Sequence, residues 1–322
     1  MSAGSLDVRV ARKSVEAEGI CSFELVSVDG APLPSFSAGS HVDVRTPGGA
    51  TRQYSLCNDP RETHRYLIAV LRDAASRGGS LAMHEQLREG DRLAISTPKN
   101  HFALDPAARS HLLLAGGIGI TPLLCMAERL ANVGAEFALH YAARSRARMA
   151  FVERIERSAY AARVQLHFDD GPAVQRLDLA KLLAGRAEGR HLYVCGPKGF
   201  MDAVLGGARA AGWPEAQLHY EFFSAEPQAA RGGDAGFEVQ LASSGRIVTV
   251  PADKTVVRAL ADAGVTVATS CEQGVCGTCL TRVIEGRPDH RDLYLTPEEQ
   301  AAGDQFLPCC SRAESARLVL DL

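Results

Sequence analysis

The sequence lacks an excess of positive charge, a basic run and a long hydrophobic stretch. Its 322 residues carry a net charge of −3, and no cluster of Lys or Arg stands out, which argues against a nucleic-acid partner. The N-terminus has no basic start followed by an apolar stretch, so no signal peptide is visible. The most apolar segment, residues 112–126, is interrupted by glycines and Pro122 and is too short to span a bilayer. We therefore expect a cytoplasmic protein that does not contact a membrane.

The pattern that is present predicts several domains. Short alternating segments separated by Gly and Pro turns fill the first hundred residues, which is typical of an antiparallel barrel. From about residue 109, short apolar runs alternate with helical segments, which predicts βα units and a parallel sheet. Residues 225–236 are small and polar without periodicity, as in a linker. We therefore predict domains at residues 1–105, 106–224 and 237–322, with the linker between the last two.

Cysteine is concentrated near the C-terminus, where five of the nine lie between positions 271 and 310. The candidate ligands are Cys271, Cys276, Cys279 and Cys309, spaced as in plant-type 2Fe–2S proteins. The glycines between them would let the backbone approach the sulfides. A structural zinc site is the alternative, but such sites usually pair two Cys-x2-Cys hooks, and here the second hook is missing. Preferring Cys309 over the adjacent Cys310 depends on spacing alone.

Two glycine turns follow predicted strands of the parallel sheet. Gly116, Gly117 and Gly119 separate an apolar strand from a helix, and backbone N–H groups at such a turn can bind phosphate. The turn lacks the third glycine of the dinucleotide fingerprint, so a purely structural turn is the alternative. Gly196 and Pro197 form a second strand-end turn. Together the two turns suit a ligand cleft at the carboxyl edge of the sheet.

These motifs resemble the nucleotide-domain motifs of the ferredoxin–NADP reductase superfamily. Residues 52–56 (RQYSL) are similar to its flavin motif, residues 77–80 (RGGS) to its flavin-phosphate loop, and residues 219–223 (HYEFF) to the segment that closes over the flavin. Residues 237–322 resemble a plant-type ferredoxin. The domain order, with residues 289–292 and 318–322, is similar to that of the phthalate dioxygenase reductase and vanillate O-demethylase reductase family.

The resemblance implies an antiparallel β-barrel flavin domain, an α/β parallel-sheet nucleotide domain and an α+β β-grasp ferredoxin domain. The implied FMN residues are Arg52, Tyr54, Ser55, Gly78, Gly79, Ser80 and Phe223. The implied NAD(P)H residues are Gly116, Gly117, Gly119, Thr121, Arg144, Cys195, Gly196 and Pro197. Ser55, Thr121, Cys195 and Phe223 would lie at the reacting rings. Each of these residues also has an ordinary interpretation as part of a turn, a strand or the core. NADH would be preferred, although arginines near position 144 could accept the 2′-phosphate of NADPH.

Electron count explains why three cofactors would occur together. A nicotinamide gives up two electrons at once, a 2Fe–2S cluster accepts one, and a flavin has a stable one-electron form. The implied function is the reductase component of a Rieske-type aromatic oxygenase or O-demethylase. Residues 237–322 carry 12 acidic and 8 basic side chains, which suits docking on a basic partner but also fits an ordinary acidic surface. The alternatives are a zinc-stabilised binding protein and a reductase serving a quinone, oxygen, a haem protein or another carrier.

Overall fold

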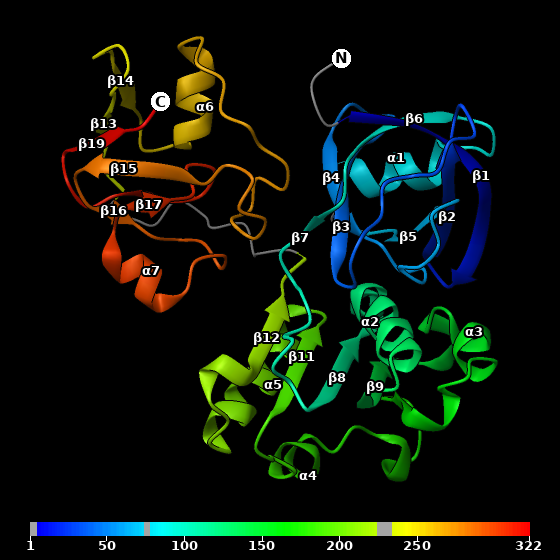
Figure 1. Ribbon diagram of the computed structural model, residues 1–322. Helices are drawn as coiled ribbons and strands as arrows, with labels where there is room; N and C mark the ends of the chain where they lie inside the picture. Colours follow the sequence, from blue (N-terminus) through cyan, green and yellow to red (C-terminus); the bar gives the residue numbers. More distant parts are fainter. Residues whose placement is uncertain (1–4, 74–77, 224–233) are drawn as a thin grey trace. The chain divides into compact units, whose positions relative to one another are not determined.

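The computed structural model describes residues 5–73, 78–223 and 234–322 (Figure 1). The chain divides into two compact units, residues 1–223 and residues 224–322. Most of the predicted linker, residues 225–236, lies outside the described residues, as does Arg77 of the predicted phosphate loop. In the described part of the chain, no helix combines the length and apolar composition needed to cross a membrane.

The first unit begins with an antiparallel sheet. Its strands are β1 (Ser5–Ala17), β2 (Ile20–Ser27), β3 (Ser40–Arg45), β4 (Thr51–Ser55), β5 (Tyr66–Leu71), β6 (Arg92–Ser96) and β7 (Lys99–Asn100). Their hydrogen-bonded order is β4-β3-β6-β1-β2-β5, with β7 beside β3. The core of this sheet buries Val42 and Val44 of β3 together with Met83 of helix α1 (Gly79–Glu85). Because the ladder ends at β4 and β5, the predicted barrel is a curled sheet left open along one seam.

The second layer of this unit is the predicted parallel sheet. Its strands are β8 (Ser110–Gly116), β9 (Glu136–Ala143), β10 (Val164–Phe168), β11 (Arg190–Cys195) and β12 (Leu218–Glu221), in the order β10-β9-β8-β11-β12. The helices are α2 (Ile120–Asn132), α3 (Val152–Glu156), α4 (Leu179–Ala184) and α5 (Lys198–Ala210). The apolar run of β8 is buried on both faces, as expected of a central parallel strand.

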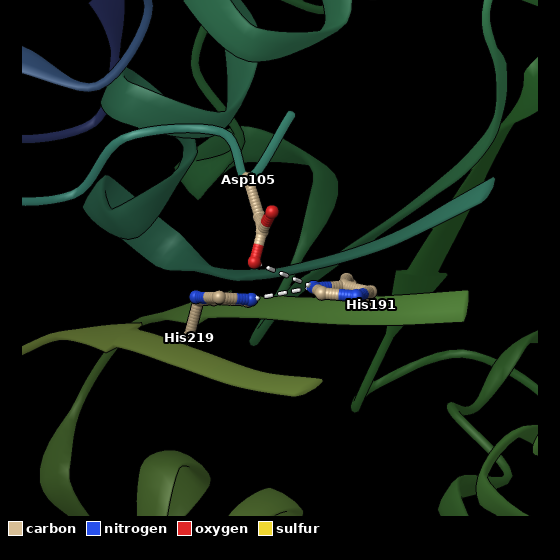
Figure 2. Close-up of side chains that lie close together, drawn as sticks. All are labelled: Asp105, His191 and His219. Carbon is tan, nitrogen blue, oxygen red and sulfur yellow. Dashed lines mark hydrogen bonds and ion pairs between the residues drawn. The ribbon is translucent and has the colours of Figure 1, made fainter. Parts of the chain in front are cut away.

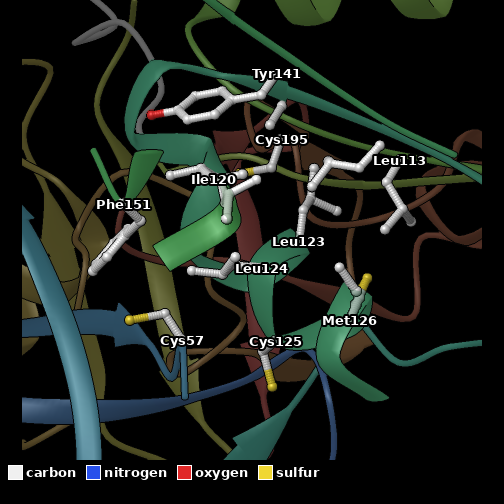
Figure 3. Close-up of a cluster of buried hydrophobic side chains, with 14 of the residues drawn as sticks. Cys57, Leu113, Ile120, Leu123, Leu124, Cys125, Met126, Tyr141, Phe151 and Cys195 are labelled. Atoms are coloured by element: carbon white, nitrogen blue, oxygen red, sulfur yellow. The ribbon is translucent and has the colours of Figure 1, made fainter. Parts of the chain in front are cut away.

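A continuous core joins the two sheets of the first unit. Side chains of α2, including Leu123 and Leu124, pack in one buried cluster with Tyr141 of the parallel sheet and with Cys57, which follows the antiparallel strand β4 (Figure 3). Arg154 of α3 also donates to the Cys57 carbonyl at 2.9 Å. This shared core accounts for one compact unit where the sequence predicts two domains.

The second unit is a mixed sheet with one covering helix, the predicted α+β arrangement. Its strands β13 (Phe237–Leu241), β14 (Ile247–Val250), β15 (Thr281–Glu285), β17 (Gln305–Phe306) and β19 (Arg317–Leu320) follow the order β14-β13-β19-β15-β17. Strands β16 (Pro288–Asp289) and β18 (Arg312–Ala313) form a separate pair. Helix α6 (Val256–Asp262) buries Leu260 against the sheet, and α7 (Pro297–Ala302) begins at a Thr296–Glu299 capping box.

Candidate functional site

The four predicted cluster cysteines come together in two pairs. The Cys271 thiol faces Cys276, and the Cys279 thiol faces Cys309; all four side chains are buried. A hydrogen bond from the Cys271 thiol lowers the pKa of Cys276 to about 5, and the same contact raises the pKa of Cys271. Two pairs of thiols are the arrangement that two irons need, so these residues fit a 2Fe–2S cluster.

Cys310 is placed differently from the four candidate ligands. Its half-exposed thiol contacts the Leu307 carbonyl and the Ser311 hydroxyl, each at 3.7 Å, although it also neighbours Cys309. The Cys309 side chain is the one that faces a second cysteine across the loop. The geometry therefore supports the preference for Cys309 that spacing alone suggested.

The glycines of the cluster loop have a packing role beside the predicted one. The N–H of Gln273 does donate to the Cys271 sulfur at 3.3 Å, as a cluster-wrapping loop requires. Gly277, however, has a φ of 69°, and a Cβ there would lie 2.3 Å from the Tyr294 ring. A Cβ on Gly274 would lie 2.5 Å from the Cys310 sulfur. Glycine is therefore needed at both positions because neighbouring side chains pack directly against the loop backbone.

A buried ion network supports the cluster loop. Arg291 forms ion pairs with Asp234 at 2.6 Å and with Asp289 at 2.5 Å, and its side chain is 6% exposed. The Arg291 N–H donates to Ser311, which follows Cys310, while the Ser311 hydroxyl donates to Asp292. The segment 289–292, which the family resemblance singled out, thus stabilises the chain directly after Cys309 and Cys310.

The two glycine turns meet at the carboxyl edge of the parallel sheet. Strands β8 and β11 are neighbours, and the chain runs outward from them in opposite directions, which makes this edge a topological switch point where ligands bind. A Cβ on Gly119 would lie 2.2 Å from the Cys195 carbonyl oxygen, and one on Gly196 would lie 3.0 Å from the Gly116 Cα. Only glycines allow the two turns to pack this closely.

Predicted flavin and nicotinamide residues approach each other at the same edge. Ser55, at the end of β4, donates to Glu221 at 3.3 Å, and Glu221 lies opposite Cys195 in the β11–β12 ladder. Burial raises the pKa of Glu221 to about 7, and burial also raises the pKa of Cys195, so that its thiol stays neutral. Residues far apart in sequence therefore lie together where the two sheets meet.

The predicted FMN-phosphate residues also come together. The Arg52 side chain packs on Gly79, where a Cβ would lie 2.9 Å from its Cγ. Its Nη1 donates to the Thr51 carbonyl, and no carboxylate forms an ion pair with it in the described part of the chain. A half-buried cation without an anionic partner fits a phosphate ligand. Tyr54 lies two residues on, on the same face of β4, with a half-buried ring.

The remaining predicted flavin and nicotinamide residues make contacts that do not by themselves indicate a ligand. Gly78 precedes α1 with a φ of 92°, and the Ser80 hydroxyl accepts from the Asp73 N–H at 3.2 Å. Thr121 is buried and donates to the Ile118 carbonyl at 3.1 Å. Arg144 is exposed just beyond β9. Phe223, the last residue of the first unit, is 37% exposed.

Two residues of this region had no predicted role. Glu221 lies in the segment 219–223, and its signal in the sequence is a carboxylate between two aromatic residues, Tyr220 and Phe222. Gln53 has a buried side-chain nitrogen that finds no hydrogen-bond acceptor among the described residues. A ligand oxygen would satisfy it, but a strand glutamine gives no warning of this in the sequence.

Glycine turns at a switch point, a second sheet beside them and a four-cysteine domain define a modular iron–sulfur oxidoreductase. The model of a 2Fe-2S iron-sulfur cluster binding domain matches residues 239–314, which confirms the predicted cluster domain. The model of a dimethylamine monooxygenase subunit DmmA-like N-terminal domain matches residues 96–218.

Known proteins match the whole chain. It is 56% identical over 318 residues to a vanillate O-demethylase oxidoreductase of Pseudomonas putida, across 98% of this chain and 100% of the relative. A phthalate dioxygenase reductase structure, described as modular for electron transfer from pyridine nucleotides to 2Fe–2S, is 41% identical with a TM-score of 0.76, covering 99% of this chain and 98% of that one. A type IV self-sufficient cytochrome P450 monooxygenase is 41% identical with a TM-score of 0.88; this chain spans 41% of its length. The chain therefore belongs to the family of vanillate O-demethylase oxidoreductases and phthalate dioxygenase reductases.

Proposed function

We propose that this oxidoreductase carries electrons from NADH through bound FMN to its 2Fe–2S cluster, and from there to a Rieske-type oxygenase that acts on an aromatic compound. The observation that carries the first half is the contact of Ser55 with Glu221 beside Cys195, because it joins the predicted flavin and nicotinamide residues. When bound, FMN would link a two-electron donor to a one-electron acceptor. We place this activity in the cytoplasm, where NADH is supplied.

The chain's own residues would bind and orient the two nucleotides. Arg52 and the turn at Gly78–Ser80 would hold the FMN phosphate, and Tyr54 would cover one face of the flavin ring. The Ser55 hydroxyl would be shared between Glu221 and the ring. Gly119 and Gly196 would let the two turns pack closely at the switch point, beside which the nicotinamide would bind.

FMN in place of FAD is testable on the purified protein. Flavin released by denaturation should have the mass of FMN, and release of FAD would contradict the proposal. Arg52→Gln should weaken FMN binding by about tenfold or more, because it removes a charge-assisted contact. Arg45→Gln, an exposed arginine on the neighbouring strand β3, is the matched control and should bind FMN normally.

NADH preference is proposed from the family resemblance. Arg144 lies exposed beyond the carboxyl end of β9, where it can reach a 2′-phosphate, so we expect some turnover with NADPH. Specificity constants for both nucleotides decide this. A large advantage for NADPH would contradict it.

A Rieske-type acceptor is supported by the residues exposed beside the cluster loop and by the difference in reduction potential between the two kinds of cluster. Exposed Leu280 follows the ligand Cys279, exposed Leu293 hydrogen-bonds the loop at Gly274, and Glu272 is exposed beside Cys271. Two exposed leucines and an exposed glutamate beside the cluster loop suit brief docking to a basic partner. Plant-type clusters lie near roughly −400 mV and Rieske centres at about −150 mV or above, so transfer would be favoured by about four powers of ten.

The acceptor is tested by mixing the reduced protein with a Rieske oxygenase from the same source at low salt. The proposal expects rapid oxidation of the cluster and turnover of the oxygenase. A haem monooxygenase is the alternative acceptor, because a similar chain is part of a cytochrome P450 monooxygenase. Transfer to a haem protein or quinone alone would contradict the Rieske assignment and leave the cofactor assignments intact.

A further inference from the structure

Three side chains from separate segments of the first unit converge on one point with no role in the proposed electron path. Asp105 lies in the loop before β8, His191 is the second residue of β11, and His219 is the second residue of β12 (Figure 2). The glycine turn at Gly196 lies at the other end of β11, five residues from His191, or roughly 16 Å at strand spacing. The cluster of Asp105, His191 and His219 is therefore separate from the nucleotide edge.

The two imidazoles meet edge to edge. His191 Nδ1 and His219 Nε2 are 2.8 Å apart, the ring centres are 5.1 Å apart, and the ring planes differ by 12°. The distance between ring centres exceeds the distance between nitrogens by about one ring radius for each imidazole, so the two nitrogens lie on the line between the ring centres. Both nitrogens therefore point their in-plane lone-pair directions into the same narrow gap, as ligands of one cation or partners of one proton do.

Asp105 is held beside this gap by the backbone. Its Oδ1 accepts the Ala107 N–H at 2.7 Å, which leaves Oδ2 directed at His191 Nδ1 at 3.7 Å (Figure 2). The Asp105 N–H donates to the Tyr193 hydroxyl at 2.8 Å, and the Tyr193 ring stacks on His219 with centres 4.5 Å apart. One fully buried tyrosine thus positions both the carboxylate and an imidazole.

A shared proton explains only part of this geometry. It would satisfy the 2.8 Å contact between the rings but would leave Asp105 Oδ2 at 3.7 Å, too far for a hydrogen bond. Zinc–ligand bonds of about 2.0–2.1 Å at tetrahedral angles place ligand atoms roughly 3.3 Å apart. On binding zinc, the 2.8 Å distance between the two imidazole nitrogens would lengthen and the 3.7 Å distance from Asp105 Oδ2 to His191 Nδ1 would shorten, each by roughly half an ångström. All three ligand atoms already lie within 4.8 Å of one another.

We propose that Asp105, His191 and His219 form a binding site for Zn²⁺ or a similar late first-row divalent cation, with water as the fourth ligand. Two imidazoles and one carboxylate are a donor set that zinc accepts, whereas Mg²⁺ prefers oxygen ligands alone. The ion would tie β11, β12 and the preceding loop together.

The same sheet contains a natural control for this site. His140 Nδ1 and His167 Nε2 are 3.0 Å apart, with ring centres at 5.3 Å and planes 18° apart. This pair, on β9 and β10, repeats the edge-to-edge contact, but no third ligand converges on it among the described residues. Comparing the two pairs separates a three-ligand site from a simple imidazole pair.

The experiment measures zinc and iron per chain after dialysis of the iron-replete holoprotein against buffered Zn²⁺. Wild type and His140→Gln should each retain one more zinc than His219→Gln, with equal iron in all three. Asp105→Asn keeps the acceptor for Ala107 and should fold normally, but zinc affinity should fall about tenfold or more. Zinc should raise the thermal midpoint of wild type and of His140→Gln only, and Mg²⁺ should not.

Equal zinc content in wild type and His219→Gln would overturn the proposal. So would loss of the same zinc in His140→Gln, because the imidazole pairs would then bind without a carboxylate. A shared proton alone predicts no extra zinc in any variant.

Discussion

At the residue scale, the four cluster cysteines give the sharpest expectation. Cys271→Ser, Cys276→Ser, Cys279→Ser and Cys309→Ser should each lose most of the iron, because each removes one of two paired thiolates. Cys310→Ser should keep it, since that thiol contacts Leu307 and Ser311. Iron analysis and the visible spectrum measure this. Full iron in the Cys309 variant with loss in the Cys310 variant would reverse the ligand assignment.

Glu221 gives a pH-dependent expectation at the same scale. Burial raises its pKa to about 7, whereas a glutamate in the unfolded chain titrates near about 4.3. Between these values the folded state holds a proton that the unfolded state has lost, so stability from Glu221 is full at low pH and is lost as pH rises toward 7.

Glu221→Gln should remove this pH dependence. Wild type should lose a few degrees of thermal midpoint relative to the variant between about pH 5 and 7.5, since ~1 kcal/mol shifts a unit of this size by roughly 2–4 °C. Ser55→Ala should move the loss to higher pH, because the Ser55 hydrogen bond lowers the Glu221 pKa. Parallel melting curves for wild type and Glu221→Gln would show that the carboxyl titrates normally.

At the element scale, the contact between the two glycine turns is the critical feature. Gly119→Ala would place a methyl group 2.2 Å from the Cys195 carbonyl oxygen, so the turns must separate. We expect a loss of about 1–3 kcal/mol in stability and a large rise in KM for NADH. Gly206→Ala is the matched control: it lies within α5, and its Cβ would meet nothing within 4 Å. It should stabilise the protein slightly; equal effects of both changes would contradict the assignment.

The elements differ in how far the sequence predicts them, for physical reasons. Strand β8 is a continuous apolar run bounded by glycine, and α2 follows it with a helical pattern, so both were predictable. Strands β16, β17 and β18 have two residues each and carry no periodicity. Three ligands of the cluster site were predictable because Cys271, Cys276 and Cys279 lie in one short segment, whereas the choice of Cys309 depended on its distance along the chain from Cys279. The contact of Ser55 with Glu221 joins residues 166 positions apart, which no local pattern encodes.

At the scale of the whole molecule, charge is divided unevenly along the chain. Residues 237–322 have a net charge of −4, which leaves +1 on the remainder. If the acidic side chains steer docking, Glu272→Lys beside the cluster should slow cluster oxidation by a Rieske oxygenase by about tenfold at low salt. Asp253→Lys makes the same charge change in the turn before α6 and should have a smaller effect. High salt should remove the difference; identical rates at low salt would count against steering.

Electron flow from NADH to the cluster is the central claim, and an anaerobic titration tests it most directly. An excess of NADH, which supplies two electrons per molecule, should reduce both the flavin and the 2Fe–2S cluster. Cluster reduction is seen as bleaching of the cluster absorbance and appearance of its paramagnetic signal. In Cys276→Ser the flavin should be reduced while no cluster signal appears, because the ligand set is incomplete. A wild-type cluster that stays oxidised beside a fully reduced flavin would contradict the account.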